Sequence, residues 1–140
     1  MNVENNMQIV TIEKIVNEAL KKDSTKLNLT KHLIGDNNLM NIMLSIDLSN
    51  LIILNLDSNN ISAEGMQYFI GCKSLTKLTN LNLSNNNLRD KGMEYFQKCE
   101  FLNKLTNLNF ENNCIGPEGM EYFVECKFLN KLTNLNFSKN

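Results

Sequence analysis

The sequence has little of the material from which most catalytic and metal-binding sites are built. Its 140 residues include no Trp, one His, one Pro and one Arg. A hydrolase dyad or a zinc site that depends on His therefore has too few candidate residues. The sequence also offers no nucleophile–base pair, no carboxylate pair at a fixed spacing and no phosphate-binding loop. We therefore expect a protein that is not an enzyme and that binds no cofactor or metal.

The chain also lacks excess charge and long apolar runs. Its formal net charge is −1, so no strong field would draw nucleic acid or an anionic membrane to it. No stretch approaches the roughly 18 apolar residues of a membrane span, and residues 1–6 do not resemble the basic start of a Sec signal. We expect no nucleic acid partner, no membrane and a cytoplasmic location, with delivery into a host cell by a non-Sec route as an alternative.

Four cysteines are present, and their spacing argues against cross-links. Cys72, Cys99 and Cys126 are evenly spaced along the chain, at the period of the repeat described below, which predicts that they lie on successive helices. A disulfide needs Cα atoms within about 7 Å of each other, less than the usual distance between packed helices. Structural zinc usually takes at least one closely spaced pair, and Cys114 lies elsewhere in the repeat. All four are predicted to be reduced thiols, as in a reducing compartment.

Asn and Leu are abundant, and they occur in a fixed order. With a period of 27, the phrase LTNLNLSNNNL at 78–88 aligns with LTNLNFENNCI at 105–115. An earlier copy occupies 51–61, a truncated one begins at Leu132, and a weaker one begins at Ser24. Each full unit also contains Gly-Met-x-Tyr-Phe followed by a Cys. Such self-similarity is typical of a repeat architecture.

Each repeat is predicted to contain a short strand, a turn and a helix. Met66, Phe69 and Ile70 have the spacing of one helical face. Ser62 or Gly116 suits the N-cap position, and Pro117 suits the first helical residue. The pattern indicates helices of about three turns in the repeats. A further helix is expected at about 8–22, where it would cover the first layer of the core.

The repeated phrase resembles the leucine-rich repeat motif L-x-x-L-x-L-x-x-N-x-L. A unit of this period that contains a full helix is similar to the ribonuclease-inhibitor-like class of that family. The resemblance implies an α/β leucine-rich repeat solenoid shaped as a horseshoe arc, with a parallel β-sheet of about five strands on its concave side and α-helices on its convex side. The predicted organisation is a capping helix in 1–23 and repeats in 24–140, divided as 24–50 (degenerate), 51–77, 78–104, 105–131 and 132–140 (truncated).

The asparagines of the repeat fall into two sets, and strand alternation assigns only the second set to the concave surface. Asn59, Asn86 and Asn113 are expected to turn inward and bond the loops of neighbouring repeats, with His32 in the same place in the degenerate repeat. Residues on the other strand face would line the concave surface. The candidate partner-binding residues there are Asn28, Ile53, Asn55, Asp57, Asn80, Asn82, Asn107, Asn109, Glu111, Asn134 and Asn136. An alternative is that this Asn column bonds along the sheet and only solvates it.

The resemblance implies a non-catalytic protein–protein interaction module. It would bind a protein or an extended peptide on its concave face or rim. Alternatives are a regulator of a small GTPase or of another enzyme, and a microbial effector that acts in a host cell. Arg89, the single Arg, is expected to form a solvated ion pair with the adjacent Asp90.

A further expectation concerns the last repeat, which supplies Leu132, Leu135 and Phe137 but no helix. Met120 and Phe123 of the preceding helix would then lack a neighbour. We expect that the natural protein continues, or that this end meets a partner, including a second copy of the chain.

Overall fold

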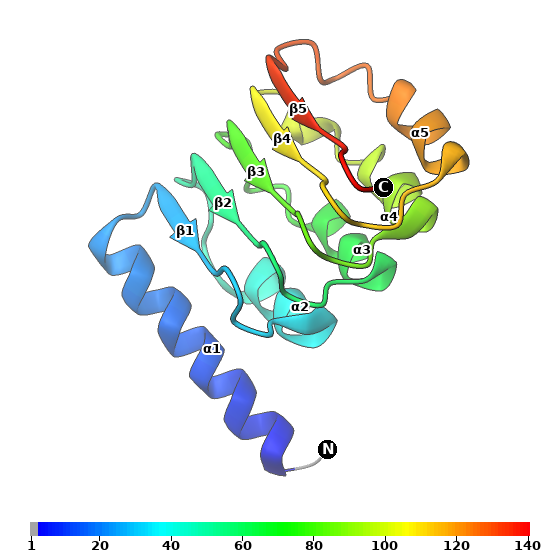
Figure 1. The fold of residues 1–140 in the computed structure, drawn as a ribbon. Coiled ribbons are helices and arrows are strands. Elements are labelled where there is room, and N and C mark those ends of the chain that lie inside the picture. The colour runs from blue at the N-terminus through cyan, green and yellow to red at the C-terminus, as the bar shows by residue number, and fades with distance from the viewer. Residues whose placement is uncertain (1–2) are drawn as a thin grey trace.

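The computed structural model describes residues 3–140, with side chains described from residue 11 onward (Figure 1). In chain order, the elements are α1 (Val3–Lys22), β1 (Lys26–Asn28), α2 (Gly35–Ser45), β2 (Ile53–Asn55), α3 (Ala63–Gly71), β3 (Asn80–Asn82), α4 (Arg89–Phe96), the 3₁₀ turn η1 (Glu100–Leu102), β4 (Asn107–Asn109), α5 (Pro117–Val124) and β5 (Asn134–Asn136).

Within this part of the chain, five parallel strands form one open sheet in the order β1-β2-β3-β4-β5. The register follows the sequence repeat, because Leu27 pairs with Leu54, Leu54 with Leu81, and so on to Leu135. The strands lie in one layer and α2 to α5 in another (Figure 1). Strands pair at about 4.8 Å and helices pack at about 8–10 Å, so this arrangement curves with the sheet inside. The predicted α/β solenoid with a parallel sheet is confirmed.

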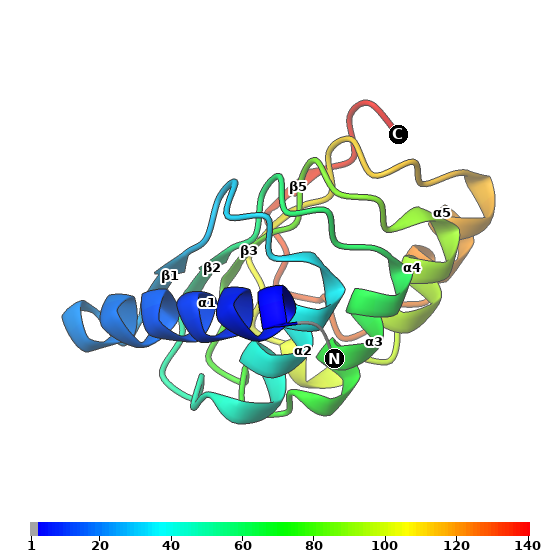
Figure 2. The same ribbon diagram turned by 90° about the horizontal axis from the view of Figure 1, so that it is seen from below.

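Helix α1 lies beside the first repeat, on the side of β1 away from β2 (Figures 1 and 2). It packs against β1 and α2. Ile12 and Val16 are buried there against the first core layer. The helix begins at Val3, several residues before the predicted start near residue 8. It covers the side of the first repeat that has no neighbouring repeat.

The core runs between the two layers and is continuous from Ile12 of α1 to Cys126, with Leu132 and Phe137 of the last repeat partly buried against it. Leu and Phe of each strand phrase point into it, and Phe69, Phe96 and Phe110 are among its largest fully buried side chains. The rings of Phe96 and Phe110 meet edge to face, with centroids 5.0 Å apart, a favoured geometry for aromatic pairs. The predicted burial of Phe96 is confirmed.

Helix α2, with eleven residues, has the predicted three turns, but the helices of the three full repeats are shorter. Helix α3 has nine residues, and α4 and α5 have eight each. The reason lies at the cysteines, where the N–H of Cys72 bonds the carbonyl of Phe69 at 2.9 Å and the N–H of Cys99 bonds that of Phe96 at 2.9 Å. These three-residue bonds tighten the last turn and bring both thiols into the core.

Alternate helices receive a cap from the repeat before them. Ser62 caps α3 as predicted and accepts a bond from the N–H of Glu64. Its own N–H donates to Asp36 Oδ1 at 2.8 Å. At α5, the equivalent Asp90 accepts bonds from the N–H groups of Gly116 at 2.6 Å and Gly119 at 2.9 Å. A carboxylate at a helix N-terminus is stabilising because unpaired N–H groups point at it.

The expectation of an Arg89–Asp90 ion pair is wrong. Asp90 caps α5, while Arg89 Nε donates to Asn87 Oδ1 at 3.0 Å. Arg89 has a φ of 55°, a left-handed conformation that Gly35 adopts at the same position two repeats earlier, with a φ of 60°. This conformation directs the Arg89 N–H to the carbonyl of Asn113. It also places Asp90 under the next helix, away from its neighbour in sequence.

Apolar side chains are exposed where β5 and α5 end the stack. Met120 is 36% exposed, Val124 64% and Leu135 46%, whereas the equivalent Met93 and Leu108 are buried. Phe123 of α5 still packs on the last repeat, with its ring centroid 4.9 Å from that of Phe137. Whether a partner covers this face stays a prediction.

Candidate functional site: the concave face

The inward set, here called the turn asparagines, comprises Asn59, Asn86, Asn113 and Asn140. Asn59 is fully buried. Its Oδ1 accepts bonds from the N–H groups of His32 and Ile34 in the previous turn. Its Nδ2 donates to the carbonyls of Leu29 at 2.7 Å and Asp57 at 3.0 Å. The predicted inward orientation is confirmed, and each amide ties two neighbouring repeats together.

The same pattern continues along the stack, except at His32. Asn140 accepts bonds from the N–H groups of Asn113 and Ile115 and donates to the carbonyl of Phe110. The His32 ring makes only a local bond, from Nδ1 to the carbonyl of Thr30 at 2.9 Å, and it is exposed, so the expectation that it turns inward is wrong. It has no earlier repeat to bond, because α1 precedes it instead.

The second set, here called the face asparagines, comprises Asn28, Asn55, Asn82, Asn109 and Asn136. Each Oδ1 accepts a bond from the backbone N–H two residues ahead, at 2.9 to 3.1 Å. Asn is the residue that makes this turn most readily, since its short side chain reaches its own backbone. These bonds end each strand and fix the orientation of every carboxamide.

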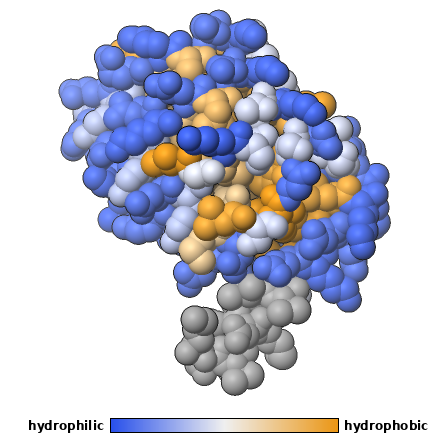
Figure 3. Space-filling view, turned by 180° about the vertical axis from the view of Figure 1, so that it is seen from behind, coloured by the Kyte–Doolittle hydropathy of each residue, from blue (hydrophilic) through white to orange (hydrophobic). Residues whose placement is uncertain are grey.

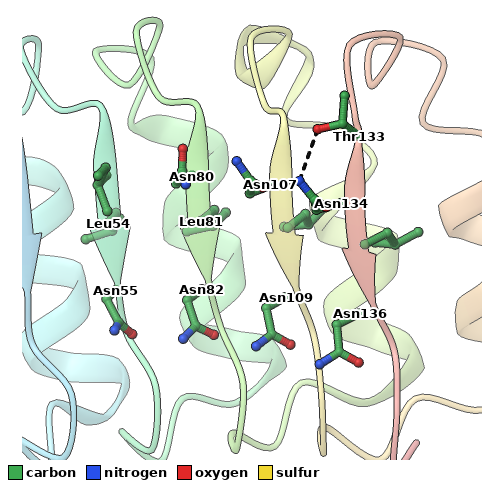
Figure 4. A pocket seen from close by; sticks show the side chains of 13 residues that line it. Leu54, Asn55, Asn80, Leu81, Asn82, Asn107, Asn109, Thr133, Asn134 and Asn136 are labelled. Atoms are coloured by element: carbon green, nitrogen blue, oxygen red, sulfur yellow. Dashed lines mark hydrogen bonds between the residues drawn. The ribbon is translucent and has the colours of Figure 1, made fainter.

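The amide nitrogens of the face asparagines are mostly free of intramolecular partners. Asn136 Nδ2 donates to Glu111 Oε2 at 3.2 Å. Within residues 11–140, Asn55, Asn82 and Asn109 make no hydrogen bond through Nδ2, and all three are half-buried. Figure 4 shows their carboxamides side by side on neighbouring strands. The alternative of an Asn column bonded along the sheet therefore does not describe these three residues.

The row at the start of the strands behaves differently. Asn134 Nδ2 donates to Asn107 Oδ1 across the sheet at 2.6 Å. It also donates to the hydroxyl of Thr133 at 3.2 Å, the bond that Figure 4 marks. Asn80 Oδ1 accepts from the Thr79 hydroxyl at 2.7 Å. This row is partly satisfied from within, so it leaves fewer free donors than the face asparagines.

An open groove of about 520 Å³ runs over β2 to β5. It is lined by the predicted residues Ile53, Asn55, Asn80, Asn82, Asn107, Asn109, Asn134 and Asn136. Thr133 and the strand leucines Leu54, Leu81, Leu108 and Leu135 also line it and are not among the predicted residues. Strand alternation assigns the leucines to the core, which is why the sequence does not predict them here, although Leu135 is half exposed at the last strand.

Three predicted residues lie outside this groove: Asn28, Asp57 and Glu111. Asn28 is on the first strand, beyond the groove. Asp57 accepts bonds from the Ser84 hydroxyl and from Asn85 Nδ2, both at 2.7 Å. Partial burial opposes its ionisation, but hydrogen bonds from Asn85 and Ser84 outweigh that effect and lower its pKa. The pKa of Glu111 is lowered by a hydrogen bond from Lys139 and by the charge of that residue.

The described residues hold no other constellation with evident chemistry. Among them, no group of three His, Cys, Asp or Glu side chains is placed to hold a metal ion. The four cysteines are free, as predicted, and burial raises the pKa of Cys99 and Cys126 to about 12 each. No helix within residues 3–140 is long and apolar enough to cross a membrane.

Comparison with known protein families agrees with this geometry. A family model described as leucine-rich repeat matches residues 47–69, 74–96 and 101–124, which together make up half of the chain. The chain belongs to the leucine-rich repeat family. The three matches begin at positions 47, 74 and 101, and this even spacing is the one that sets the strand register. No curated protein matches the leucine-rich repeat chain significantly. Leucine-rich repeats generally mediate protein–protein interaction and are typically non-catalytic.

Proposed function

We propose that this leucine-rich repeat protein is a non-catalytic binding module that holds a protein segment or extended peptide on its concave face. The observation that carries the proposal is the state of Asn55, Asn82 and Asn109. Each has its oxygen fixed by its own backbone and its Nδ2 without an intramolecular partner. Three oriented donors on adjacent strands are a prepared surface for acceptors of a partner.

Preorganisation matters because binding usually loses free energy when side chains become ordered. A solvent-exposed Asn would have to be immobilised by its ligand. The carboxamide of Asn82 is held by the N–H of Ser84 at 3.0 Å before any ligand arrives. Each hydrogen bond to a partner then contributes on the order of 0.5–1.5 kcal/mol. A polypeptide supplies such acceptors in its carbonyl groups and in Asp, Glu, Asn and Gln side chains.

The test uses a substitution that removes the donor and keeps the turn. Asn82→Asp/Asn109→Asp preserves an oxygen for the N–H groups of Ser84 and Glu111 but replaces both NH₂ groups. We expect a partner purified on the unaltered protein to bind this variant roughly tenfold more weakly or worse. Calorimetry with the purified partner measures the difference.

The matched control is Asn17→Asp/Asn37→Asp, which makes the same change at two exposed residues of α1 and α2, away from the groove. It should bind as the unaltered protein does. Equal loss in both double variants would show a general charge effect and would contradict the proposal. If the purified partner is a GTPase or another enzyme whose turnover the protein changes, the same variants show whether that regulation also uses the concave face.

A further inference from the structure

The loops that lead into β3, β4 and β5 form one edge of the molecule, here called the strand-start rim: residues 72–79, 97–106 and 125–133. They lie at the same edge because the strands are parallel and in register. Together these loops contain six lysines and two glutamates. The strand-start rim is therefore basic, although the whole chain has a net charge of −1.

Three of these lysines recur at the same position of the repeat. They are Lys77, Lys104 and Lys131, and all are exposed. None of the three forms an ion pair with another described residue, and Lys77 Nζ donates to Asn50 Oδ1 at 2.8 Å. Lys73 also forms no ion pair with a described residue, whereas Lys98 Nζ pairs with Glu94 Oε1 at 3.2 Å and Lys127 Nζ lies 4.0 Å from Glu125 Oε2. The three recurring lysines are therefore exposed charges of this edge that lie outside any ion pair.

The opposite edge of the same repeats has the reverse sign. Residues 56–66, 83–93 and 110–120 link the strands to the helix N-termini and contain five acidic and two basic residues. Two of the acids, Asp57 and Glu111, lie next to the groove, and their pKa values are lowered by their hydrogen-bond partners. The groove therefore runs between a basic and an acidic edge. Seen from behind, hydrophilic residues dominate the margins of the molecule (Figure 3).

The basic edge adjoins the donors of the groove. Each recurring lysine precedes a groove residue by three positions, as Lys77 precedes Asn80 and Lys104 precedes Asn107. Lysine ammonium groups and carboxamide NH₂ groups recognise the same ligand chemistry, namely negatively charged or neutral oxygen acceptors. A charged rim beside such donors would raise the association rate of an acidic ligand and would orient it.

We propose that the strand-start rim recognises an acidic protein segment, which then extends into the groove. This inference rests on the proposed function and names the class of partner. Acidic side chains of the segment face Lys77, Lys104 and Lys131, and its backbone carbonyls reach the face asparagines. The acidic opposite edge repels the reverse placement, so the two rims together set the direction in which the segment crosses the sheet.

The test uses a fluorescent peptide of alternating Glu and Ser, with a Lys-Ser peptide of the same length as its counterpart. Fluorescence anisotropy is measured on the full chain at low and high salt. We expect the Glu-Ser peptide to bind and the Lys-Ser peptide to bind at least tenfold more weakly. Salt should weaken the Glu-Ser complex, because exposed charges are screened beyond about 10 Å at 0.1 M ionic strength.

Two triple variants distinguish an effect of the rim lysines from an effect of the net charge of the protein. Lys77→Gln/Lys104→Gln/Lys131→Gln should weaken Glu-Ser binding about tenfold, since each exposed ion pair contributes modestly. Lys14→Gln/Lys21→Gln/Lys31→Gln removes the same charge from exposed lysines outside both edges and should change binding less than twofold. Thermal melts of both variants verify that each is folded. Equal weakening by the two variants, or no measurable binding of the Glu-Ser peptide, would overturn the proposal.

A thymidine oligonucleotide tests whether the rim binds anions in general. If it binds as tightly as the Glu-Ser peptide, and if Lys77→Gln/Lys104→Gln/Lys131→Gln abolishes its binding, the choice of a protein segment is overturned.

Asn82→Asp/Asn109→Asp separates this inference from the proposed function. If that variant loses the peptide and the lysine variant retains it, the groove function stands and the rim proposal falls. If only the lysine variant loses it, the rim proposal stands and the groove function falls.

Discussion

The turn asparagines and the face asparagines are the same residue four positions apart, yet they do opposite things. The carboxamide of Asn59 is fully buried and makes four hydrogen bonds, all to backbone groups of its own or the previous turn. That of Asn55 is half-buried and makes one such bond, through its oxygen. The difference arises because β2 ends at Asn55 and the chain turns before Asn59, with Ser58 in a left-handed conformation at a φ of 56°. Asn55 keeps the outward orientation of the strand, whereas the turn directs the carboxamide of Asn59 into the core. The buried amide stabilises the fold, and the exposed one leaves a donor for a ligand.

The cysteines show how strongly burial alone changes the reactivity of one residue type. Burial raises the pKa of Cys99 to about 12, whereas Cys114 is exposed in a turn. Only the thiolate reacts, so at pH 8 a thiol of that pKa is ionised to roughly one part in ten thousand. In the native protein, Cys114 should react with a thiol reagent at once and the other three should not. Unfolding without reductant should release four thiols in total, and a smaller number would contradict the prediction of free cysteines.

The core sets the upper limit for the effect of a substitution on stability. Phe96 is fully buried against Phe110 and Phe128. Phe96→Ala should lower the free energy of unfolding by about 3–5 kcal/mol, because it leaves a cavity in addition to the lost burial. Urea unfolding followed by circular dichroism measures this. A loss below that of any asparagine variant would show that the core is packed differently.

A turn asparagine should come next. Asn113 is fully buried, and its Nδ2 donates to the carbonyls of Leu83, Phe110 and Glu111. Asn113→Ala leaves these carbonyls without this partner, so we expect a loss of about 2–3 kcal/mol in the same urea assay. Asn103→Ala, at an exposed loop residue, is the control and should change little. If the two variants unfold at the same urea concentration, the turn asparagines do not link the repeats energetically.

The cap between repeats should have a smaller effect. Asp90→Ala removes the acceptor for the N–H groups of Gly116 and Gly119 and should cost about 1 kcal/mol, as for other helix caps. Asp90→Asn keeps a neutral oxygen in place and should recover most of that loss. Differential scanning calorimetry compares the two midpoints. An Asn variant as unstable as the Ala variant would mean that the charge, and not the hydrogen bond, stabilises α5.

A face asparagine should have the smallest effect on stability. Asn82→Ala removes one bond to the N–H of Ser84 in a half-buried site, so we expect a loss of about 0.5 kcal/mol, within the range of surface substitutions. The comparison between the two asparagine sets fails if Asn82→Ala and Asn113→Ala destabilise the protein equally in urea. In that case both sets would be structural, and the concave face would have no free donors to offer.

The repeat period predicts most of the fold, because every strand pair obeys it. The register Leu54↔Leu81↔Leu108, the N-cap at Ser62 and the inward turn of Asn59 all follow from alignment of the repeats. Eight of the eleven candidate concave residues line the groove for the same reason. A periodic sequence reports what its repeats share.

What the repeats do not share is harder to predict. Gly35 and Arg89 are left-handed, while Ser62 and Gly116 at the same position are extended. Alignment of the repeats shows only the features that they share, and this alternation is not one of them. The sequence pattern therefore does not predict the role of Asp90. The pattern also overestimates the helix lengths, since the period shows where apolar residues recur and not where an α-helix tightens into a three-residue turn.

The alternation of caps has a consequence for how this solenoid can be lengthened. Asp36 and Asp90 give a cap, and α3 and α5, whose N-cap residues are Ser62 and Gly116, receive one. The true modular unit is therefore a pair of repeats, twice the visible period. Duplicating a repeat that receives a cap would leave one helix start without its carboxylate, and duplicating a repeat that gives one would leave an Asp without its N–H partners. Insertion of an even number of repeats preserves every cap. A lengthened solenoid therefore has to keep the alternation between repeats that give a cap and repeats that receive one.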